Sequence, residues 1–545
     1  MNSASGKPPT MGVVVGGSLS RGVEVRLDAS FPVEQVKVGG FVTIQGQSSR
    51  FFAIISDVTL EASDSSLRAV PPDASDPFVA SVMSGTGAYA VVNVLPQLTL
   101  SSDAFDMLSG PQPARSIPAH FAPVYAASEE DVRAVFGTED DRHIWIGSPL
   151  DMEGTRVCLD LGELVKRSNG VFGKSGTGKT FLTRILLAGI LQKDVAVNLV
   201  FDMHNEYGWQ GTREGGPGVK GLKQLFPSRV AVFSLDAETS RRRGVSPDAE
   251  VRIGYGEIEP ADIEILAATL NLTPQGVTAV YSLVRRFGQE SWLEEFLARE
   301  NREELASLAD ETNENFQVLF TLHRRLRTVG RMGFLTPKAP EDAVRRILEY
   351  LDRGVHVVLE FGRYGNDLSA YILVANLLTR RIHDRYVERM EQASGGRNQE
   401  PRPLLITIEE AHRFLTPAVA GQTIFGTIAR EMRKYRVSLL VVDQRPSGID
   451  EEVLSQLGTR FVYLLDNEHD VDAVLAGIAG ARELRTVLSR LESQQQALIF
   501  GHALPMPVVV RAREYGSEES YREFGFRDAA ELKRQAEEDG KDLFG

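Results

Sequence analysis

The pattern of hydrophobic positions divides the chain into an N-terminal part built from short strands and a longer part in which strands alternate with helices. Residues 11–100 hold runs rich in Val, Ile, Phe and Thr, and turn residues separate them. Short, regularly spaced strands are typical of a small barrel or sandwich. The runs are MGVVVGG, GVEVRLD, GFVTIQG, RFFAIISDVTLE and AYAVVNVLPQLTL.

From about residue 151 the apolar runs become almost continuous, and longer segments with helical spacing lie between them. Such strands indicate a parallel sheet that is buried on both faces. They are VAVNLVFD (195–202), VAVFSLD (230–236), VHVVLEFG (355–362), LLITIEEAH (404–412), VSLLVVDQ (437–444) and TRFVYLLD (459–466). Residues 258–350 have helical spacing and few strand signals, which predicts a helical bundle inserted into the α/β unit.

The pattern therefore predicts an α/β protein with an N-terminal β-barrel, an interrupted core and a C-terminal helical tail. The C-terminal segment is expected to form a charged helix with exposed aromatic side chains, Tyr521, Phe524 and Phe526. Segment 106–150 is expected to be a linker that carries one strand, HIWIG at 143–147. The expected units are the barrel (1–105), the linker (106–150), the first core part (151–257), the helical insertion (258–350), the second core part (351–510) and the tail (511–545).

Composition and charge narrow the class of protein. The 545 residues include 60 basic and 74 acidic side chains, a net charge of −14, and residues 61–150 carry −8 of it. This balance argues against a chain that coats nucleic acid through bulk charge, although a locally basic channel stays open. Cys158 is the single cysteine, so an intramolecular disulfide framework is excluded and a reducing, cytoplasmic setting is expected. No apolar run approaches the roughly 18–20 residues that span a bilayer.

A phosphate-binding loop follows the apolar strand end Gly170–Phe172. The segment GKSGTGKT at 173–180 fits G-x-x-x-x-G-K-[ST] and opens a helix. Its glycines let backbone N–H groups turn towards phosphate oxygens, and the helix N-terminus favours the anion. Lys179 supplies a cation for the β- and γ-phosphates, and the Thr180 hydroxyl can ligate Mg²⁺. The expected nucleotide-binding residues are Gly173, Ser175, Gly176, Thr177, Gly178, Lys179 and Thr180.

Two acidic residues end the strand LLITIEE. Glu409 stands where a carboxylate would support Mg²⁺, and Glu410 stands where one would polarise the attacking water. Gln444 follows the next apolar strand, where its amide could hydrogen-bond the γ-phosphate or the water. The basic helix end between these strands offers an arginine for a neighbouring subunit's γ-phosphate; we favour Arg430 and keep Arg433 as the alternative.

Taken together, these motifs resemble the HerA family within the HerA/FtsK group of P-loop ATPases. The resemblance rests on GKSGTGKT, on DMHNEY at 202–207, on IEEAH at 408–412, on AREMRKYRVSLLVVDQRPSGI at 429–449 and on the N-terminal strands, and it covers most of residues 11–510. It implies a RecA-like core, a barrel of the HAS type and ATPase roles for Lys179, Thr180, Glu409, Glu410, Arg430 and Gln444. Glu206 matches a family position to which we assign no definite role.

The resemblance further implies a homohexameric ring that uses ATP and Mg²⁺ to move double-stranded DNA. It also implies a partner nuclease, NurA-like or another effector, that docks at the barrel in DNA end processing or antiphage defence. No nuclease motif stands out in this chain, so we expect a partner to cut the DNA. Two alternatives stay open: a DNA-pumping ATPase of conjugation or secretion, and an ATP-stabilised ring scaffold that recruits an effector.

Contact with DNA would need cations that face the pore of such a ring. Candidates are Arg241, Arg242 and Arg243, which follow the third apolar strand, and Arg363, which follows VHVVLEF. Arg324, Arg325 and Arg327 of the insertion form a further basic cluster. No base-reading module is present, so contact with the backbone, independent of sequence, is the expected mode.

Overall fold

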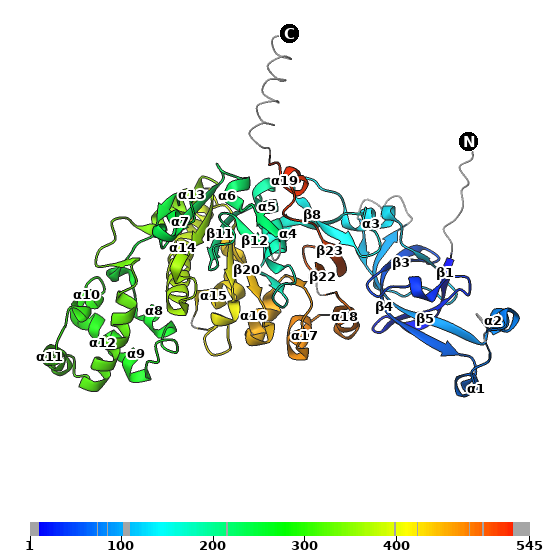
Figure 1. Ribbon diagram of the computed structural model, residues 1–545, viewed down its shortest axis with the longest axis horizontal. Helices are drawn as coiled ribbons and strands as arrows, with labels where there is room; N and C mark the ends of the chain where they lie inside the picture. Colours follow the sequence, from blue (N-terminus) through cyan, green and yellow to red (C-terminus); the bar gives the residue numbers. More distant parts are fainter. Residues whose placement is uncertain are drawn as a thin grey trace, which may run out of the picture.

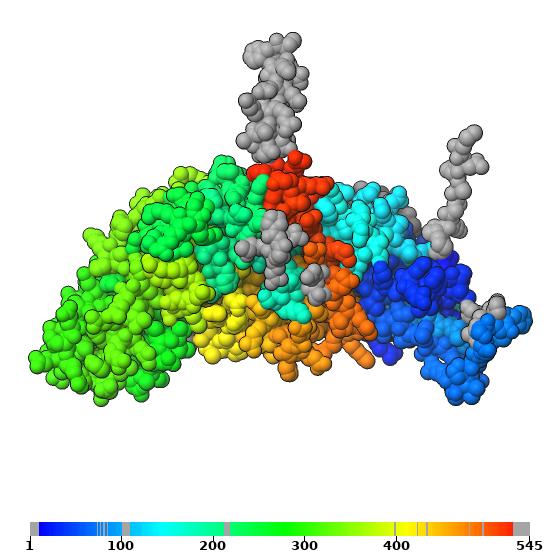
Figure 2. All heavy atoms as spheres, in the orientation of Figure 1, coloured from blue at the N-terminus to red at the C-terminus, as the bar shows by residue number. Residues whose placement is uncertain are grey.

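The computed structural model describes residues 10–73, 75–83, 86–101, 110–213, 216–396, 399–421, 423–478, 480–492 and 495–526. In Figure 1 a barrel at one end and a group of helices at the other flank a central α/β domain. Figure 2 shows the same order on the surface, with the helical insertion in green, the barrel in blue and the C-terminal segment in red against the central domain. No helix of the described residues is long and apolar enough to cross a membrane.

The N-terminal strands close into a barrel, as the sequence predicts. Six strands follow the order β2-β1-β7-β3-β4-β5, and β2 pairs with β5 to complete the circle. Closure removes the free edges that an open sheet would expose. The strands are β1 (Thr10–Ser18), β2 (Gly22–Leu27), β3 (Phe41–Gln45), β4 (Ser49–Ala62), β5 (Ala88–Ser101) and β7 (Pro123–Ala126), and β6 (Gln112–Pro113) adds to β5.

The expected linker does more than connect two domains. Its strand β7 lies between β1 and β3, where Val124 is fully buried in the barrel core. Helix α3 (Glu129–Phe136) follows, with Ser128 as its N-cap, and β8 (His143–Pro149) then joins the central sheet. The barrel therefore extends past residue 105, because β1 and β3 would otherwise lack a partner strand between them.

The central sheet has the order β15-β14-β18-β11-β19-β20-β10-β21-β22-β23-β8-β9. The strands from β15 to β21 are parallel, whereas β21 to β9 pair antiparallel. The parallel strands are β15 (Ala249–Glu250), β14 (Val230–Ser234), β18 (His356–Glu360), β11 (Val197–Asp202), β19 (Leu404–Glu409), β20 (Val437–Asp443), β10 (Asn169–Phe172) and β21 (Thr459–Val462). The antiparallel half adds β22 (Gln496–Gly501), β23 (Val508–Ala512), β8 and β9 (Val157–Asp160).

Helices cover this sheet and make up the insertion. Helix α5 (Lys179–Lys193) follows the phosphate loop, and α14 (Leu368–Ser394) packs with the insertion helix α8. The other helices beside the sheet include α7 (Ala237–Arg242), α15 (Ile424–Glu431), α16 (Glu451–Gln456), α17 (Glu468–Leu475) and α18 (Ala481–Leu488). The insertion comprises α8 (Pro260–Ile265), α9 (Pro274–Phe287), α10 (Trp292–Leu297), α11 (Arg302–Thr312), α12 (Phe316–Gly330) and α13 (Ala343–Asp352).

The C-terminal segment packs against its own chain, which corrects the expectation of exposed aromatic side chains. Tyr521 and Phe524 of the segment around α19 (Glu518–Glu523) are only 2% and 1% exposed. The Tyr521 hydroxyl accepts a hydrogen bond from the Lys220 N–H, and Arg513 pairs with Glu523 at 2.6 Å. The expected boundary at residue 511 falls inside β23, and the part of the expected tail from residue 527 onward lies outside the described residues.

Candidate functional site

The phosphate loop lies at the carboxyl end of β10, as the sequence predicts. Gly178 is the N-cap of α5 and has a φ of 111°, a conformation that glycine adopts without strain. The Lys179 ammonium donates to the carbonyl oxygens of Gly173 and Lys174 at 2.6 and 2.8 Å, so the loop curls around this side chain. Burial lowers the pKa of Lys179 to about 8, although Glu410, Asp443 and Glu409 act in the opposite direction.

The two acidic residues that end β19 lie beside this loop. Glu409 is 8% exposed, and its Oε1 accepts a hydrogen bond from the Tyr207 hydroxyl at 2.9 Å. The Tyr371 hydroxyl donates to the Glu409 carbonyl oxygen at 3.0 Å, which fixes the strand end. Burial raises the pKa of Glu409 to about 8, and nearby Asp202 adds to the effect. Glu409 Oε2 is buried and has no hydrogen-bond partner within the described part of the chain.

Glu410 and Gln444 form a pair at the next two strand ends. Glu410 has a φ of 50°, a left-handed conformation that turns the chain sharply after β19. The Gln444 Nε2 donates to Glu410 Oε1 at 3.1 Å. The amide predicted to sense a phosphate thus contacts the carboxylate predicted to polarise water.

A cavity of ≈ 520 Å³ connects these groups. It brings together most of the side chains that the sequence singled out for nucleotide chemistry, at the carboxyl ends of β10, β19 and β20. Lining residues include Ser175, Gly176, Thr177, Gly178, Lys179, Thr180, Glu409, Glu410 and Gln444. A nucleoside triphosphate and a divalent cation fit the chemistry of this lining, because the Lys179 ammonium lies within the phosphate loop and a buried carboxylate oxygen of Glu409 lacks a partner among the described residues.

A cation here would need ligands beyond the protein. Within the described residues no group of three or more His, Cys, Asp or Glu side chains could hold a metal ion. Mg²⁺ usually keeps several waters and binds one or two protein oxygens together with substrate phosphates. The Thr180 hydroxyl and the Glu409 carboxylate, which the sequence predicts as cation ligands, both line the cavity and could serve in this mode.

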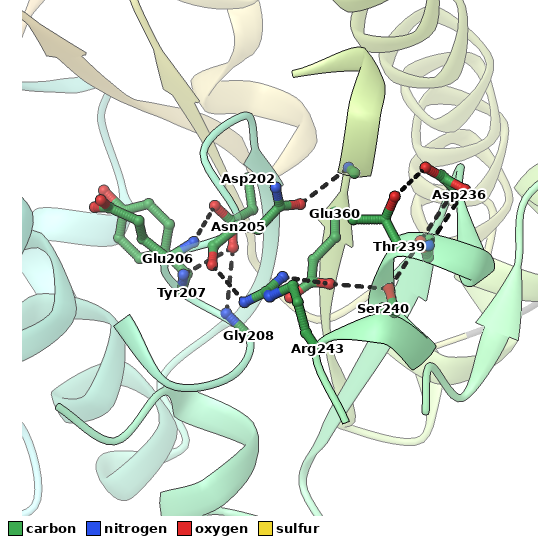
Figure 3. A network of polar contacts seen from close by, with 12 residues as sticks. Asp202, Asn205, Glu206, Tyr207, Gly208, Asp236, Thr239, Ser240, Arg243 and Glu360 are labelled. Atoms are coloured by element: carbon green, nitrogen blue, oxygen red, sulfur yellow. Dashed lines mark hydrogen bonds and ion pairs between the residues drawn. The ribbon is translucent and has the colours of Figure 1, made fainter. Parts of the chain in front are cut away.

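The strand end of β11 contributes side chains that sequence reasoning did not assign. Asp202 is fully buried and accepts hydrogen bonds from the N–H groups of Glu206, Tyr207 and Gly208 (Figure 3). Arg184 of α5 donates to the Glu206 carbonyl oxygen at 2.6 Å and lines the cavity. The DMHNEY stretch pointed to this region through the family resemblance, whereas Arg184 carries no local signal in the helix sequence.

Asp443 and His412 brace the loop from the side of β20. Asp443 accepts hydrogen bonds from the His412 N–H at 2.6 Å and from the Arg445 N–H at 2.6 Å. The Asp443 hydrogen bond to the imidazole raises the pKa of His412. The Asp443 carbonyl oxygen accepts from the Gly173 N–H, so this pair anchors the start of the phosphate loop.

Arg430 lies far from the cavity of its own chain. It lines a separate hollow of ≈ 300 Å³ with Arg167, Gly458 and other residues at the amino ends of β10, β20 and β21. The phosphate loop occupies the opposite, carboxyl end of β10. Arg430 is 24% exposed at its side chain and lies 3.9 Å from Glu452. The side chain of the alternative, Arg433, lies outside the described residues.

The arginines predicted to contact DNA mostly have acidic partners in this structure. Arg243 contacts Glu360 at 3.4 Å (Figure 3), Arg363 contacts Asp236 at 3.4 Å, and Arg242 pairs with Glu238 on the same helix. Arg241 forms no ion pair within the described part of the chain. All four arginines lie near the carboxyl ends of β14 and β18, beside the strand end of β11.

Fold and site define a P-loop ATPase. A family model described as "Helicase HerA, central domain" matches residues 144–382, and one described as "HAS barrel domain" matches residues 11–73. Over these two ranges the chain is similar to the HerA family. The matched ranges cover the barrel strands β1 to β4 and the core from β8 to α14.

Curated relatives carry the same family name. The DNA double-strand break repair helicase HerA of Pyrococcus furiosus is 25% identical over 414 residues, 71% of this chain and 72% of the relative. Its counterpart in Saccharolobus solfataricus is 25% identical over 392 residues, again 71% and 72%. Among solved structures, VirB4 of Thermoanaerobacter pseudethanolicus aligns with a TM-score of 0.45 and 13% identity over 71% of this chain and 100% of that one.

Proposed function

We propose that this ATPase is a DNA translocase or helicase that moves duplex DNA through a homohexameric ring. The observation that carries the proposal is the cavity in which Lys179, Glu409 and the Glu410–Gln444 pair meet. The relatives that bear the HerA name are DNA repair helicases, which points to DNA as the substrate of the motion.

Each residue of the cavity has a role in this proposal. Lys179 neutralises the β- and γ-phosphates, and Thr180 with Glu409 holds Mg²⁺, which would supply charge neutralisation at the phosphates. Glu410 accepts a proton from the attacking water, and Gln444 leaves Glu410 to donate to the γ-phosphate. Glu409, with a pKa of about 8, is mostly protonated at neutral pH, so a bound cation would return it to its charged form, whereas a phosphate would hold Lys179 in the charged form that it already has.

The position of Arg430 supports a ring. Four-residue β10 alone separates the two edges of the sheet by about 13 Å, and Arg430 lies beyond the far edge. This arginine therefore serves hydrolysis only if a second copy of the chain places it at a neighbour's phosphate loop. Each interface of a closed ring would then hold one complete site.

In the proposed motor, DNA contacts come from Arg241, Arg242, Arg243 and Arg363. Acidic partners hold Arg242, Arg243 and Arg363 in place near one edge of the sheet. Arg363 keeps 58% of its side chain exposed, so it stays accessible to a phosphate. Binding of this kind weakens with salt and carries no base specificity.

The barrel is the proposed docking face for a partner nuclease or other effector. Among the described residues, the large hydrophobic side chains that are exposed lie in the barrel region, apart from Tyr281. Helices α1 (Ser65–Ala69) and α2 (Pro77–Met83) and the adjoining strand ends form a tip on the side of the barrel that faces away from the central domain (Figure 1). Exposed apolar side chains concentrated on one domain mark an interaction surface. They are Leu19, Val33, Leu60, Val70, Phe78, Val82, Ile117 and Phe121.

The same barrel surface favours a second candidate function, an ATP-stabilised ring scaffold that recruits and regulates an effector. ATP turnover with and without linear duplex DNA separates the two. A translocase turns over ATP several times faster on DNA, whereas a scaffold shows equal rates while it retains its partner. Unchanged turnover in intact rings would therefore contradict the translocase.

The ring is tested by complementation between two inactive chains. Arg430→Ala lowers turnover by about 10³ if this residue is a trans-acting arginine, and Lys179→Ala abolishes it. Co-expressed chains restore activity where the intact phosphate loop of one variant meets Arg430 of the other. Co-assembled rings with no activity would place Arg430 outside the reaction.

A further inference from the structure

The segment 203–208, here the β11 loop, touches the nucleotide cavity on one side. His204 and Glu206 line the cavity, and the Tyr207 hydroxyl donates to Glu409. Asp202 ties the N–H groups of Glu206, Tyr207 and Gly208 to one buried carboxylate. The β11 loop is therefore held as a single unit, so a displacement at Tyr207 carries the rest of the loop with it.

The other side of the β11 loop contacts the segment that carries Arg363. The Asn205 side-chain oxygen accepts a hydrogen bond from the Gly362 N–H at 3.0 Å. The Asn205 carbonyl oxygen accepts from Arg243 Nη2 at 3.0 Å (Figure 3). Asn205 has a φ of 57°, so its backbone is turned to offer both acceptors at once.

Glu360 fills the space behind this contact. Its side chain is 0% exposed, and its Oε2 accepts from Arg243 and Ser240, each at 3.4 Å. Its Oε1 is buried and has no hydrogen-bond partner among the described residues. A Cβ on Gly208 would lie 3.0 Å from that oxygen, so the β11 loop and Glu360 are in close contact. Burying such a carboxylate is costly, and nothing in the proposed hydrolysis uses it.

The segment Gly362–Tyr364 leads from Glu360 to the surface and to the insertion. The Arg363 N–H donates to Asp236 at 3.2 Å, and its guanidinium lies 3.4 Å from the same carboxylate. The Tyr364 hydroxyl accepts from the Gly333 N–H at 2.7 Å, beside the insertion helices. A shift of Gly362 would therefore reach an exposed arginine and the inserted bundle together.

We propose that Asn205 and Glu360 are positioning residues that couple occupancy of the nucleotide cavity to the position of Gly362–Tyr364. Nucleotide and cation engage Glu409 and change the acceptor of Tyr207, and the β11 loop passes that change to Gly362 through Asn205. Glu360 holds Arg243 against the loop so that the end of α7 moves with it. The role of this coupling in transport rests on the proposed function, because Arg363 is a proposed DNA contact.

Hydrogen–deuterium exchange tests the coupling without DNA. The full-length protein is compared with and without a saturating non-hydrolysable ATP analogue, and exchange is followed in the peptide that covers residues 361–367. The variants are Asn205→Gly, which removes the side-chain acceptor where glycine tolerates the backbone angle, and Glu360→Gln, which removes the charge. Glu238→Gln is the matched control. Glu238 also pairs with an arginine, Arg242, but this pair lies on the surface of α7, the helix whose C-cap is Arg243.

We expect the analogue to slow exchange of this peptide by about fivefold or more in the wild type and the control, the lower end of usual coupling strengths. The change is lost in Asn205→Gly and Glu360→Gln, although both bind the analogue. The proposal is overturned if the analogue slows exchange in Asn205→Gly as much as in the wild type, or if it does not slow exchange in the wild type. If Glu360→Gln does not fold, Asn205→Gly decides alone.

ATP turnover on linear duplex DNA gives the second readout. Both variants keep basal turnover within about twofold of the wild type but lose its stimulation by DNA, since coupling and chemistry are separable. A proportional fall of basal and stimulated rates would indicate a merely structural role and overturn the proposal. A wild type that DNA does not stimulate contradicts the proposed function instead, while the exchange result still judges the coupling.

Discussion

At the scale of single residues, the two oxygens of Glu409 have different surroundings. Oε1 is held by the Tyr207 hydroxyl at 2.9 Å, whereas Oε2 is buried without a partner among the described residues. An unpartnered buried carboxylate oxygen is unfavourable unless a ligand completes it. The Tyr207 hydrogen bond therefore orients one oxygen and leaves the other available to the cation that the proposed function requires.

Removing that orienting hydrogen bond should slow turnover with little change in shape. Tyr207→Phe leaves both Glu409 oxygens unpartnered, and we expect the turnover number to fall by about tenfold, the equivalent of one hydrogen bond to a charged group. The measurement is steady-state ATP hydrolysis. Tyr463→Phe is the matched control, because the buried Tyr463 hydroxyl has no partner in the described part of the chain. Equal rates of ATP hydrolysis for the two variants would show that Tyr207 does not contribute to hydrolysis.

Glu360 makes stability depend on pH. Burial, with a contribution from Asp202, raises its pKa from 4.5 to about 7. The folded state therefore keeps a proton that the unfolded state releases, and stability falls as pH rises from about 4.5 to 7, by up to about 3 kcal/mol. Thermal unfolding of Glu360→Gln should vary less than that of the wild type across this range. If the melting temperatures of the two proteins change in parallel with pH, the raised pKa of Glu360 is contradicted.

The residues of the cavity differ in how far sequence could predict them. The phosphate loop and the acidic strand end have fixed local spacing, so Lys179 and Glu409 could be placed from sequence alone, while their catalytic roles remain predictions. Tyr207 and Arg184 could not be assigned, because their importance comes from contacts across strands and helices. The acidic partners of Arg243 and Arg363 could not be predicted for the same reason. Glu360 is 117 residues from Arg243 in the sequence, and Asp236 is 127 residues from Arg363.

At the scale of elements, the six apolar strands and their parallel arrangement were predictable, whereas the antiparallel half of the sheet was not. Hydrophobic runs reveal buried strands, but a parallel strand and a buried antiparallel strand have the same composition. Direction depends on the connection, and the short link from β22 to β23 allows only an antiparallel pair. The aromatic side chains of the C-terminal segment were wrongly expected to be exposed, because local sequence does not show which surface will cover them.

The C-terminal segment contributes to stability through those aromatic side chains. Phe524 is 1% exposed and lies under the Arg513 guanidinium, 4.2 Å from its ring centre. Phe524→Ala should lower the free energy of unfolding by about 3–5 kcal/mol. Phe78→Ala is the control, since Phe78 is 76% exposed, and it should leave stability unchanged. Chemical denaturation measures both, and equal midpoints would show that the segment is not part of the folded core.

At the scale of the whole molecule, the structure separates four surfaces. The nucleotide cavity and Arg430 lie on opposite edges of one sheet, the helical insertion occupies one end, and the barrel with its exposed apolar side chains occupies the other (Figures 1 and 2). Of the net charge of −14, residues 61–150 carry −8, which places much of the acidity near the barrel. An acidic exterior would keep DNA away from the outside of a ring and favour the proposed pore.

Displacement of a third strand from duplex DNA tests the proposed translocation most directly. A triplex-forming oligonucleotide is bound to one end of a linear duplex, and its release is followed with ATP, with a non-hydrolysable analogue and with Lys179→Ala. We predict release by the wild-type protein with ATP alone, at a rate that follows ATP turnover. Binding of the duplex and hydrolysis of ATP without any release would contradict the account.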